Sequence, residues 1–263
     1  MNTPRALRPT VFALCLSLLA GSAFAQSGTK PKPYEPVSGQ EGKDVVWVPT
    51  PEVLVEKMLD MAKVTPQDVV MDLGSGDGRT VIAAAKRGAT GIGVEYNPDM
   101  VELSRRKAAE AGVSKKATFV KADLFETDLS KATVITMFLL PRINVELRPK
   151  ILDLKPGTRI VSNSFTMEDW EADETETIPE NCVSWCTALL WIVPAKVAGT
   201  WTTPQGTLRF DQQFQMVTGE FNGKPLEGRL RGTELTFTSG GRKYTGRVNG
   251  NTIEGDGWTA TKK

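Results

Sequence analysis

Glycine and acidic residues are concentrated in one short segment, residues 72–79, which has the sequence DLGSGDGR. The apolar run Val69 to Met71 precedes it and predicts a buried strand that ends at Asp72. Glycines spaced two apart permit positive φ angles where the chain reverses, and they carry no Cβ that would keep a ligand off the main chain. The segment therefore predicts the floor of a site for a bulky nucleoside cofactor.

The spacing of these glycines separates two classes of cofactor. The dinucleotide fingerprint places glycines at relative positions one, three and six, whereas Gly74, Gly76 and Gly78 stand at positions one, three and five, which argues against NAD and FAD. The segment is instead similar to the first motif of class I S-adenosylmethionine (SAM) methyltransferases, in which an acid precedes the first glycine by two residues, as Asp72 does. The resemblance implies that SAM is the cofactor and that Asp72, Gly74, Ser75 and Gly76 bind it.

Two further acids follow strand-like runs. Glu95 ends the run 91–95, about twenty residues beyond the glycine turn, which is the spacing at which an acid binds ribose hydroxyls in doubly wound folds. Asp123 follows the run 117–120 and resembles the family acid that accepts from the adenine amino group, with Leu124 beside it. In such folds ligands bind outside the carboxyl ends of the strands, so these acids are expected at one edge of the sheet.

The chain between about residues 45 and 194 alternates strand and helix. This order predicts an α/β fold with a doubly wound, Rossmann-like parallel sheet. Thr50-Pro51-Glu52 and Asn97-Pro98 are expected to start helices, each with a polar N-cap followed by proline at the first helical position. Further strands are expected at residues 132–138, 158–162 and 187–193.

Methyl transfer from a sulfonium depends on proximity and desolvation, so a catalytic base is often unnecessary. The chain has no histidine, which excludes a Ser-His-Asp triad and histidine metal ligation, and no metal is expected. The segment after the fourth strand, Phe138-Leu139-Leu140-Pro141, offers no amide to hold a planar base amine. Together with the glycine motif it resembles small protein-lysine methyltransferases, such as the mitochondrial enzymes that act on ATP synthase. The resemblance implies that Phe138, Leu140 and Pro141 line the substrate channel.

An uninterrupted acidic segment bears on the substrate. Seven carboxylates and no basic residue fall between Glu168 and Glu180. An acidic rim there would attract a lysine, an amine or a basic protein and repel nucleic acid, although a solvated loop explains the same composition. Phe165, Trp170 and Trp185 could wall an amine pocket through cation–π contacts, or could pack in the core.

The N-terminal residues predict export. Basic residues precede an apolar run, and Ala23-Phe24-Ala25 has the small-x-small form of a signal-peptidase site, so residues 1–25 are predicted to be a signal peptide. The apolar run is too short to span a membrane, and the mature protein is expected to be periplasmic or secreted. Residues 26–44 are expected to be a flexible linker, and residues 45–195 the methyltransferase domain.

Residues 197–263 differ from the rest in composition. Short alternating runs and a repeated glycine turn predict a small antiparallel β-meander or partial barrel of six to eight strands. Cys182 and Cys186 would lie roughly 13 Å apart in an extended chain, so their pairing depends on whether the segment turns. The net charge of +1 and the absence of a polybasic run indicate neither nucleic acid nor membrane as a partner.

Two functions from different classes remain open. The first is a SAM-dependent methyltransferase that acts on an amine, with a protein lysine as the favoured acceptor. The second is an exported, non-catalytic binding protein that kept the fold and recognises ligands through its C-terminal β-module. Transfer of labelled methyl groups, as opposed to SAM binding alone, distinguishes the two functions.

Overall fold

The computed structural model describes residues 1–2 and 33–263, so the predicted signal peptide lies almost wholly outside the described residues. Tyr34–Lys263 forms one compact unit. Its first part contains α1 (Glu52–Met61), β1 (Val69–Leu73), α2 (Arg79–Lys86), β2 (Thr90–Glu95), α3 (Pro98–Glu110), β3 (Ala117–Lys121), β4 (Val134–Met137), α4 (Pro141–Leu152), β5 (Arg159–Asn163), β6 (Glu174–Thr177) and β7 (Thr187–Ile192). None of the described helices is long and apolar enough to cross a bilayer.

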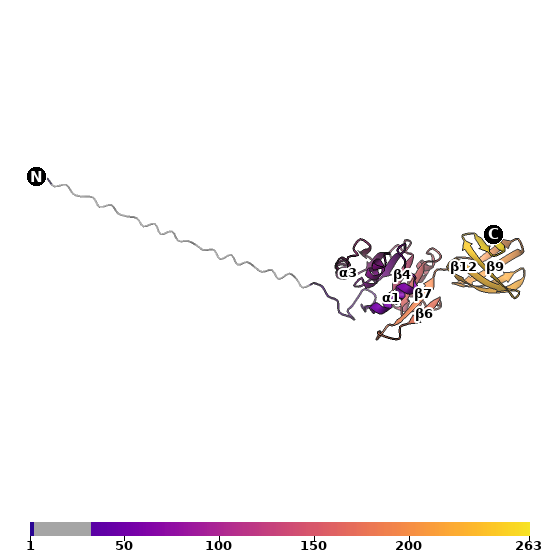
Figure 1. The fold of residues 1–263 in the computed structure, drawn as a ribbon, viewed down its shortest axis with the longest axis horizontal. Helices are drawn as coiled ribbons and strands as arrows, with labels where there is room; N and C mark the ends of the chain where they lie inside the picture. Colours follow the sequence, from indigo (N-terminus) through magenta and orange to yellow (C-terminus); the bar gives the residue numbers. More distant parts are fainter. Residues whose placement is uncertain (3–32) are drawn as a thin grey trace. The chain divides into compact units, whose positions relative to one another are not determined.

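The first part is a mixed sheet with helices on both faces (Figure 1). The strand order is β3-β2-β1-β4-β5-β7-β6, in which β1 to β5 run parallel and β7 and β6 are antiparallel to their neighbours. Successive residues of β1 face opposite sides: Val70 packs against α1, and Met71 belongs to the cluster that contains α4. The predicted α/β doubly wound fold is confirmed, and the strand order reverses between β1 and β4.

The two predicted helix starts have different outcomes. At α3, Asn97 Oδ1 accepts from the amide of Asp99 at 2.9 Å and Pro98 is the first helical residue, as predicted. At α1, Pro51 is the N-cap residue and no side chain caps the helix, so the prediction of a Thr50 cap is wrong. The Thr50 hydroxyl instead accepts from Asn163 Nδ2 at 3.3 Å, because tertiary packing brings the end of β5 beside it.

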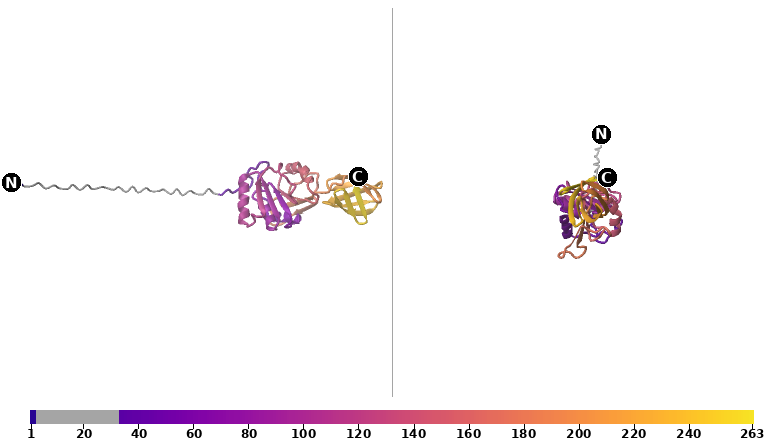
Figure 2. Two further views of the ribbon diagram at one scale, coloured as in Figure 1. Left: turned by 90° about the horizontal axis from the view of Figure 1, so that it is seen from above. Right: turned by 90° about the vertical axis from the view of Figure 1, so that its right-hand side faces the viewer.

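The second part is an eight-stranded antiparallel barrel, drawn in orange to yellow in Figure 2. Its strands are β8 (Gly199–Thr203), β9 (Gly206–Gln213), β10 (Met216–Phe221), β11 (Lys224–Arg231), β12 (Glu234–Ser239), β13 (Arg242–Asn249), β14 (Thr252–Gly255) and β15 (Trp258–Lys262). The predicted meander is confirmed, and it closes fully because β15 pairs with β8, for example at Thr261 and Thr202. Buried aromatic side chains fill its interior, with Phe237 in contact with Phe210 and Trp258.

The acidic segment is partly an edge strand, β6, and not simply a loop. Ion pairs engage four of its seven carboxylates: Asp169 with Arg148, Asp173 with Arg229, Glu174 with Arg231, and Glu176 with Lys57. Two of these cations come from β11 of the barrel, so much of the segment's charge is used within the chain. The ion pairs reduce the negative charge that the predicted acidic rim can offer to a substrate.

Candidate functional site

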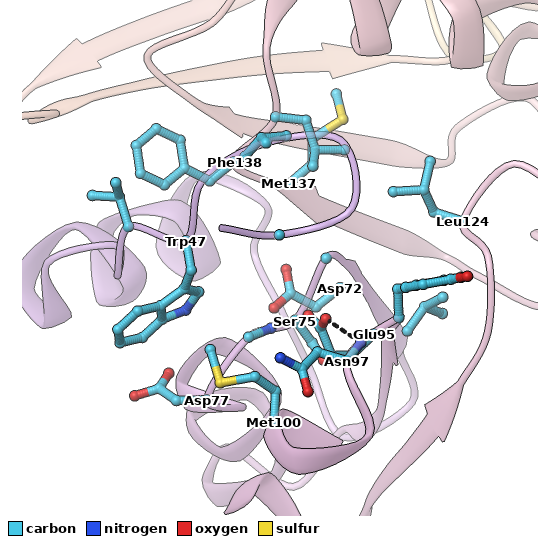
Figure 3. Close-up of a pocket in the computed structure, with 18 of the residues that line it drawn as sticks. Trp47, Asp72, Ser75, Asp77, Glu95, Asn97, Met100, Leu124, Met137 and Phe138 are labelled. Carbon is cyan, nitrogen blue, oxygen red and sulfur yellow. Dashed lines mark hydrogen bonds between the residues drawn. The ribbon is translucent and has the colours of Figure 1, made fainter. Parts of the chain in front are cut away.

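The carboxyl ends of β1, β2 and β4 and the loop after β3 meet at one edge of the sheet and line a cleft (Figure 3). The cleft contains about 1030 Å³ of empty space, including the part that is open to solvent. All seven residues predicted to bind the cofactor line it: Asp72, Gly74, Ser75, Gly76, Glu95, Asp123 and Leu124. The parallel pairing of neighbouring strands explains this convergence of acids that are distant in sequence.

Positive φ angles shape the glycine loop that forms the floor. Gly74, Gly76 and Gly78 have φ values of 73°, 52° and 80°, which glycine adopts without steric cost. A Cβ at Gly78 would lie 2.8 Å from both the Phe119 ring and Ser104, so the loop is also packed tightly from below. The backbone of the loop is thereby held in place before any ligand binds.

The Glu95 carboxylate ties the glycine loop to the end of β2. It accepts from the amide of Gly76 at 2.9 Å through one oxygen and from the amide of Asn97 at 2.9 Å through the other. Each carboxylate oxygen can accept a further hydrogen bond. The side chain is therefore oriented, and it retains the capacity to bind two vicinal hydroxyl groups.

Asp72 is buried beneath the loop, where it is 7% exposed. Burial, together with the nearby carboxylates of Asp77 and Glu95, raises its pKa to about 7, although the Thr136 hydroxyl donates to it at 2.6 Å and stabilises the charged form. Asp77 behaves in the opposite way: burial disfavours its charge, but Arg79 and Lys107 hold its pKa below the usual range. Asp72 is thus a buried carboxyl group suited to a cationic ligand group.

A segment before the sheet covers part of the cleft, and composition alone gave no indication of it. Residues 40–50, part of which was expected to be a flexible linker, line the cleft and are hydrogen-bonded to each other, with Trp47 N donating to Gln40 O at 2.9 Å. Lys43 Nζ pairs with Asp123 at 2.5 Å and lies 5.1 Å from the Tyr96 ring centroid. Trp47 contacts the glycine loop at Gly76. Because these contacts are long-range, the linker prediction missed them.

The segment after β4 contributes its first two residues to the cleft. Phe138 and Leu139 line the cleft, whereas Leu140 packs against the core at the N-cap of α4 and Pro141 begins that helix. Of the three residues predicted to line the substrate channel, Phe138 lines the cleft, whereas Leu140 and Pro141 are not among its lining residues. Leu139, which was not predicted, lines the cleft beside Phe138.

Phe138 belongs to a group of three aromatic side chains. Its ring is stacked on Phe165, with the ring centroids 5.8 Å apart, and meets Trp185 edge-on at a centroid distance of 5.6 Å. The ring centroids of Phe165 and Trp185 are 5.2 Å apart. Trp170 does not join them: it is fully buried and stacked on Phe214 at 5.8 Å. Trp170 is thus a core residue, while Phe165 and Trp185 lie next to the cleft residue Phe138.

Trp185 lies in a loop that is closed by a disulfide bond between Cys182 and Cys186. The two Cα atoms are 5.8 Å apart because the segment turns, with positive φ angles of 59° at Asn181 and 57° at Trp185. The bond confines Trp185 to a loop with few accessible conformations. The pairing that the sequence left open is therefore formed.

The residues at the cleft fit SAM. Ser75 Oγ is buried and has no hydrogen-bond partner among the described residues, so it can bond to a ligand. Asp72 would hold the ammonium group and Glu95 the ribose diol, and Leu124 and Asp123, the latter paired with Lys43, would meet the adenine ring. When bound, SAM would supply an activated methyl group on a sulfonium.

Comparisons with known proteins agree with this chemistry. Residues 72–174 match the family model of the ANTKMT methyltransferase domain. A protein-lysine N-methyltransferase of Saccharolobus islandicus is 46% identical over 133 residues, which are 49% of this chain and 83% of that protein. The chain belongs to the SAM-dependent methyltransferases. The methyltransferase is also similar to a solved structure of an RNA methyltransferase from Salinibacter ruber with S-adenosylhomocysteine, with 45% identity, a TM-score of 0.54, and coverage of 57% of this chain and 96% of that one.

More distant relatives share the same region. A lysine N-methyltransferase of Mus musculus that is named for ATP synthase is 36% identical over 130 residues, which are 49% of the methyltransferase and 52% of the mouse protein. The match thus spans about half the length of each of these two proteins. The resemblance to protein-lysine methyltransferases that the glycine motif and Phe138 indicated is confirmed by these matches.

Proposed function

We propose that the methyltransferase transfers methyl groups from SAM to the side-chain amine of a protein lysine. The main observation is the convergence of the seven predicted cofactor residues on one cleft, in a chain whose relatives include enzymes named for lysine N-methylation. Phe138 and Leu139 supply an apolar wall and no amide at the position after β4. Such a wall favours an aliphatic amine over the planar amine of a nucleobase.

The reaction needs little from the protein beyond positioning and exclusion of water. The neutral amine nitrogen forms the new N–C bond as the S–C bond breaks, the bonding electrons remain on sulfur in the departing S-adenosylhomocysteine, and the proton of the resulting methylammonium is lost to bulk solvent. Asp72, Glu95 and Asp123 orient the reactants through fixed polar contacts. Phe138 and Leu139 exclude water from the nucleophile, which must be a neutral amine.

We propose further that the methyltransferase acts in the periplasm or outside the cell. The disulfide between Cys182 and Cys186 supports this location, because disulfides persist in oxidising compartments and are rare in the cytosol. The predicted signal peptide, with cleavage after Ala25, points the same way. The partner we propose is a basic protein or other amine, without a standing contact to nucleic acid or membrane.

Transfer of radiolabelled methyl groups tests this function. Purified residues 26–263 are incubated with methyl-labelled SAM and, separately, with periplasmic protein and with total RNA, and protein hydrolysates are analysed for methyllysines. We expect label in methyllysine, and we expect Glu95→Ala to abolish it because Glu95 orients the cofactor site. Label in RNA alone would overturn the lysine proposal and favour the activity named for the Salinibacter ruber relative. SAM binding without any transfer would favour the non-catalytic function.

A further inference from the structure

Three aromatic side chains next to the cleft, Phe138, Phe165 and Trp185, leave part of their surface exposed. Phe138 and Phe165 are half-buried and Trp185 is 42% exposed. The three rings come from three separate places: the end of β4, the segment after β5, and the loop between β6 and β7. They meet at the edge of the sheet where the cofactor residues also lie, and Phe138 belongs to both groups.

Left-handed backbone conformations are frequent in the segment that contains Phe165 and Trp185. Of the seven described non-glycine residues with positive φ, four lie between residues 164 and 185: Ser164, Glu168, Asn181 and Trp185. Left-handed conformations are unfavourable for such residues, and they persist where surrounding contacts enforce them, often at ligand sites. Trp185 is one of these residues, and it contacts two aromatic neighbours from within the loop that the disulfide closes.

We propose that Phe138, Phe165 and Trp185 form an aromatic wall that holds the acceptor lysine, and that the Cys182–Cys186 disulfide keeps Trp185 in this wall. This inference rests on the proposed lysine acceptor. The π faces attract a cation, and the nitrogen gains positive charge as the methyl group is transferred. The wall therefore stabilises the charge that develops during the reaction, and its apolar surface packs along the aliphatic part of the lysine side chain.

The occupant follows from chemistry and from position. A lysine side chain has an apolar stem that can pack along the partly exposed rings, and its nitrogen becomes cationic as the methyl group is transferred, next to the cleft that Phe138 lines. A nucleic acid would bring phosphates, which the described wall residues offer no charge to bind. Trp185 is thus a specificity-determining residue for the acceptor, whereas the cofactor site is built from other residues.

The test compares variants at Trp185 with a matched control in the same loop. Trp185→Ala removes the ring, Trp185→Phe keeps an aromatic face, Cys182→Ser with Cys186→Ser opens the loop, and Val183→Ala changes a fully exposed neighbour. KM and kcat are measured with a methylatable acceptor protein, and the dissociation constant of SAM is measured by calorimetry. Thermal melting checks that each variant is folded.

We expect Trp185→Ala to raise the acceptor KM about tenfold or more, in line with the loss of a cation–π contact and of apolar packing. Trp185→Phe should recover most of this loss, the double cysteine variant should raise KM by about three- to tenfold, and Val183→Ala should change nothing. SAM affinity should stay within about twofold throughout. The proposal would be refuted if folded Trp185→Ala had an unchanged acceptor KM, or if its affinity for SAM fell as much as its affinity for the acceptor.

A second measurement separates failure of the wall from failure of the proposed function. Binding of Nα-acetyl-trimethyllysine amide is measured by calorimetry in the presence of S-adenosylhomocysteine, without any turnover. Binding by the wild type that Trp185→Ala abolishes supports the wall even if no protein lysine is labelled, in which case the proposed function alone fails. Lysine labelling together with probe binding that is independent of Trp185 refutes the wall alone.

Discussion

Substitution of Asp72 by Asn should change the pH dependence of both folding and cofactor binding. Burial raises the pKa of Asp72 from 3.8 to about 7. Because the folded protein binds this proton more tightly than the unfolded chain does, Asp72 stabilises the fold below its unfolded pKa, and this stabilisation is lost as the pH rises through 7. With about 1.4 kcal/mol per pKa unit, about 2 to 3 kcal/mol is lost between pH 5 and pH 8.

The assay is urea unfolding of wild type and Asp72→Asn at both pH values without cofactor. The asparagine carries no charge, and its Oδ1 can still accept from Thr136. We expect the free energy of unfolding of the variant, relative to the wild type, to rise by about 2 to 3 kcal/mol from pH 5 to pH 8. Taking this difference reduces the contribution of other titrating groups, and Asp77, whose pKa is held below its usual range, stays ionised throughout this interval.

Cofactor binding should reverse the effect, since the ammonium group of SAM favours ionised Asp72. At pH 7 the wild type should release about half a proton when SAM binds, because a group with a pKa of about 7 is then half protonated. Calorimetry in buffers with different ionisation enthalpies measures this release, and Asp72→Asn should show almost none. A stability difference that does not vary with pH, or equal proton release by both proteins, would refute the reasoning.

Three further substitutions test packing and buried charges in the fold. Gly93→Ala should destabilise the fold by about 1 to 3 kcal/mol, because a Cβ there would lie 2.5 Å from the Phe119 ring; a midpoint equal to that of wild type in urea unfolding would contradict this. Asp77→Asn should cost about 3 kcal/mol at neutral pH and less in acid, where the lowered pKa of Asp77 is crossed; thermal melts at pH 3 and pH 7 measure the difference. Arg229→Met should cost about 2 kcal/mol, since it leaves the fully buried carboxylate of Asp173 without its cation; a loss no larger than that in Arg247→Met, a control at an exposed ion pair, would argue against it.

Much of the site could be predicted because its geometry follows from local spacing. Asp72 and Glu95 each lie at the end of a strand, and parallel strands that share an edge bring such residues together whatever the loops between them do. Asn97 caps its helix through an amide two residues away, so sequence alone contains that interaction. The cofactor residues and the order of elements depend on contacts of this kind.

The remaining features depend on contacts between distant parts of the chain. Thr50 has the sequence of an N-cap, yet its hydroxyl meets Asn163, 113 residues away. Lys43 lies in a segment with the composition of a linker, and its pairing with Asp123 appears only in the folded chain. The Cys182–Cys186 bond depends on a turn with left-handed backbone at Asn181 and Trp185, and no glycine lies between the two cysteines to indicate it.

The pairing of β15 with β8 has a consequence for the order in which the chain can fold. The last strand of the barrel, β15, ends at Lys262 and supplies the partner that β8 needs, so the barrel cannot close until the residues of β15 have been made. The methyltransferase sheet has all its strands once Ile192 has been made. The catalytic part can therefore fold first, and a chain that stops before Trp258 would contain an intact sheet joined to a barrel with open edges at β14 and β8.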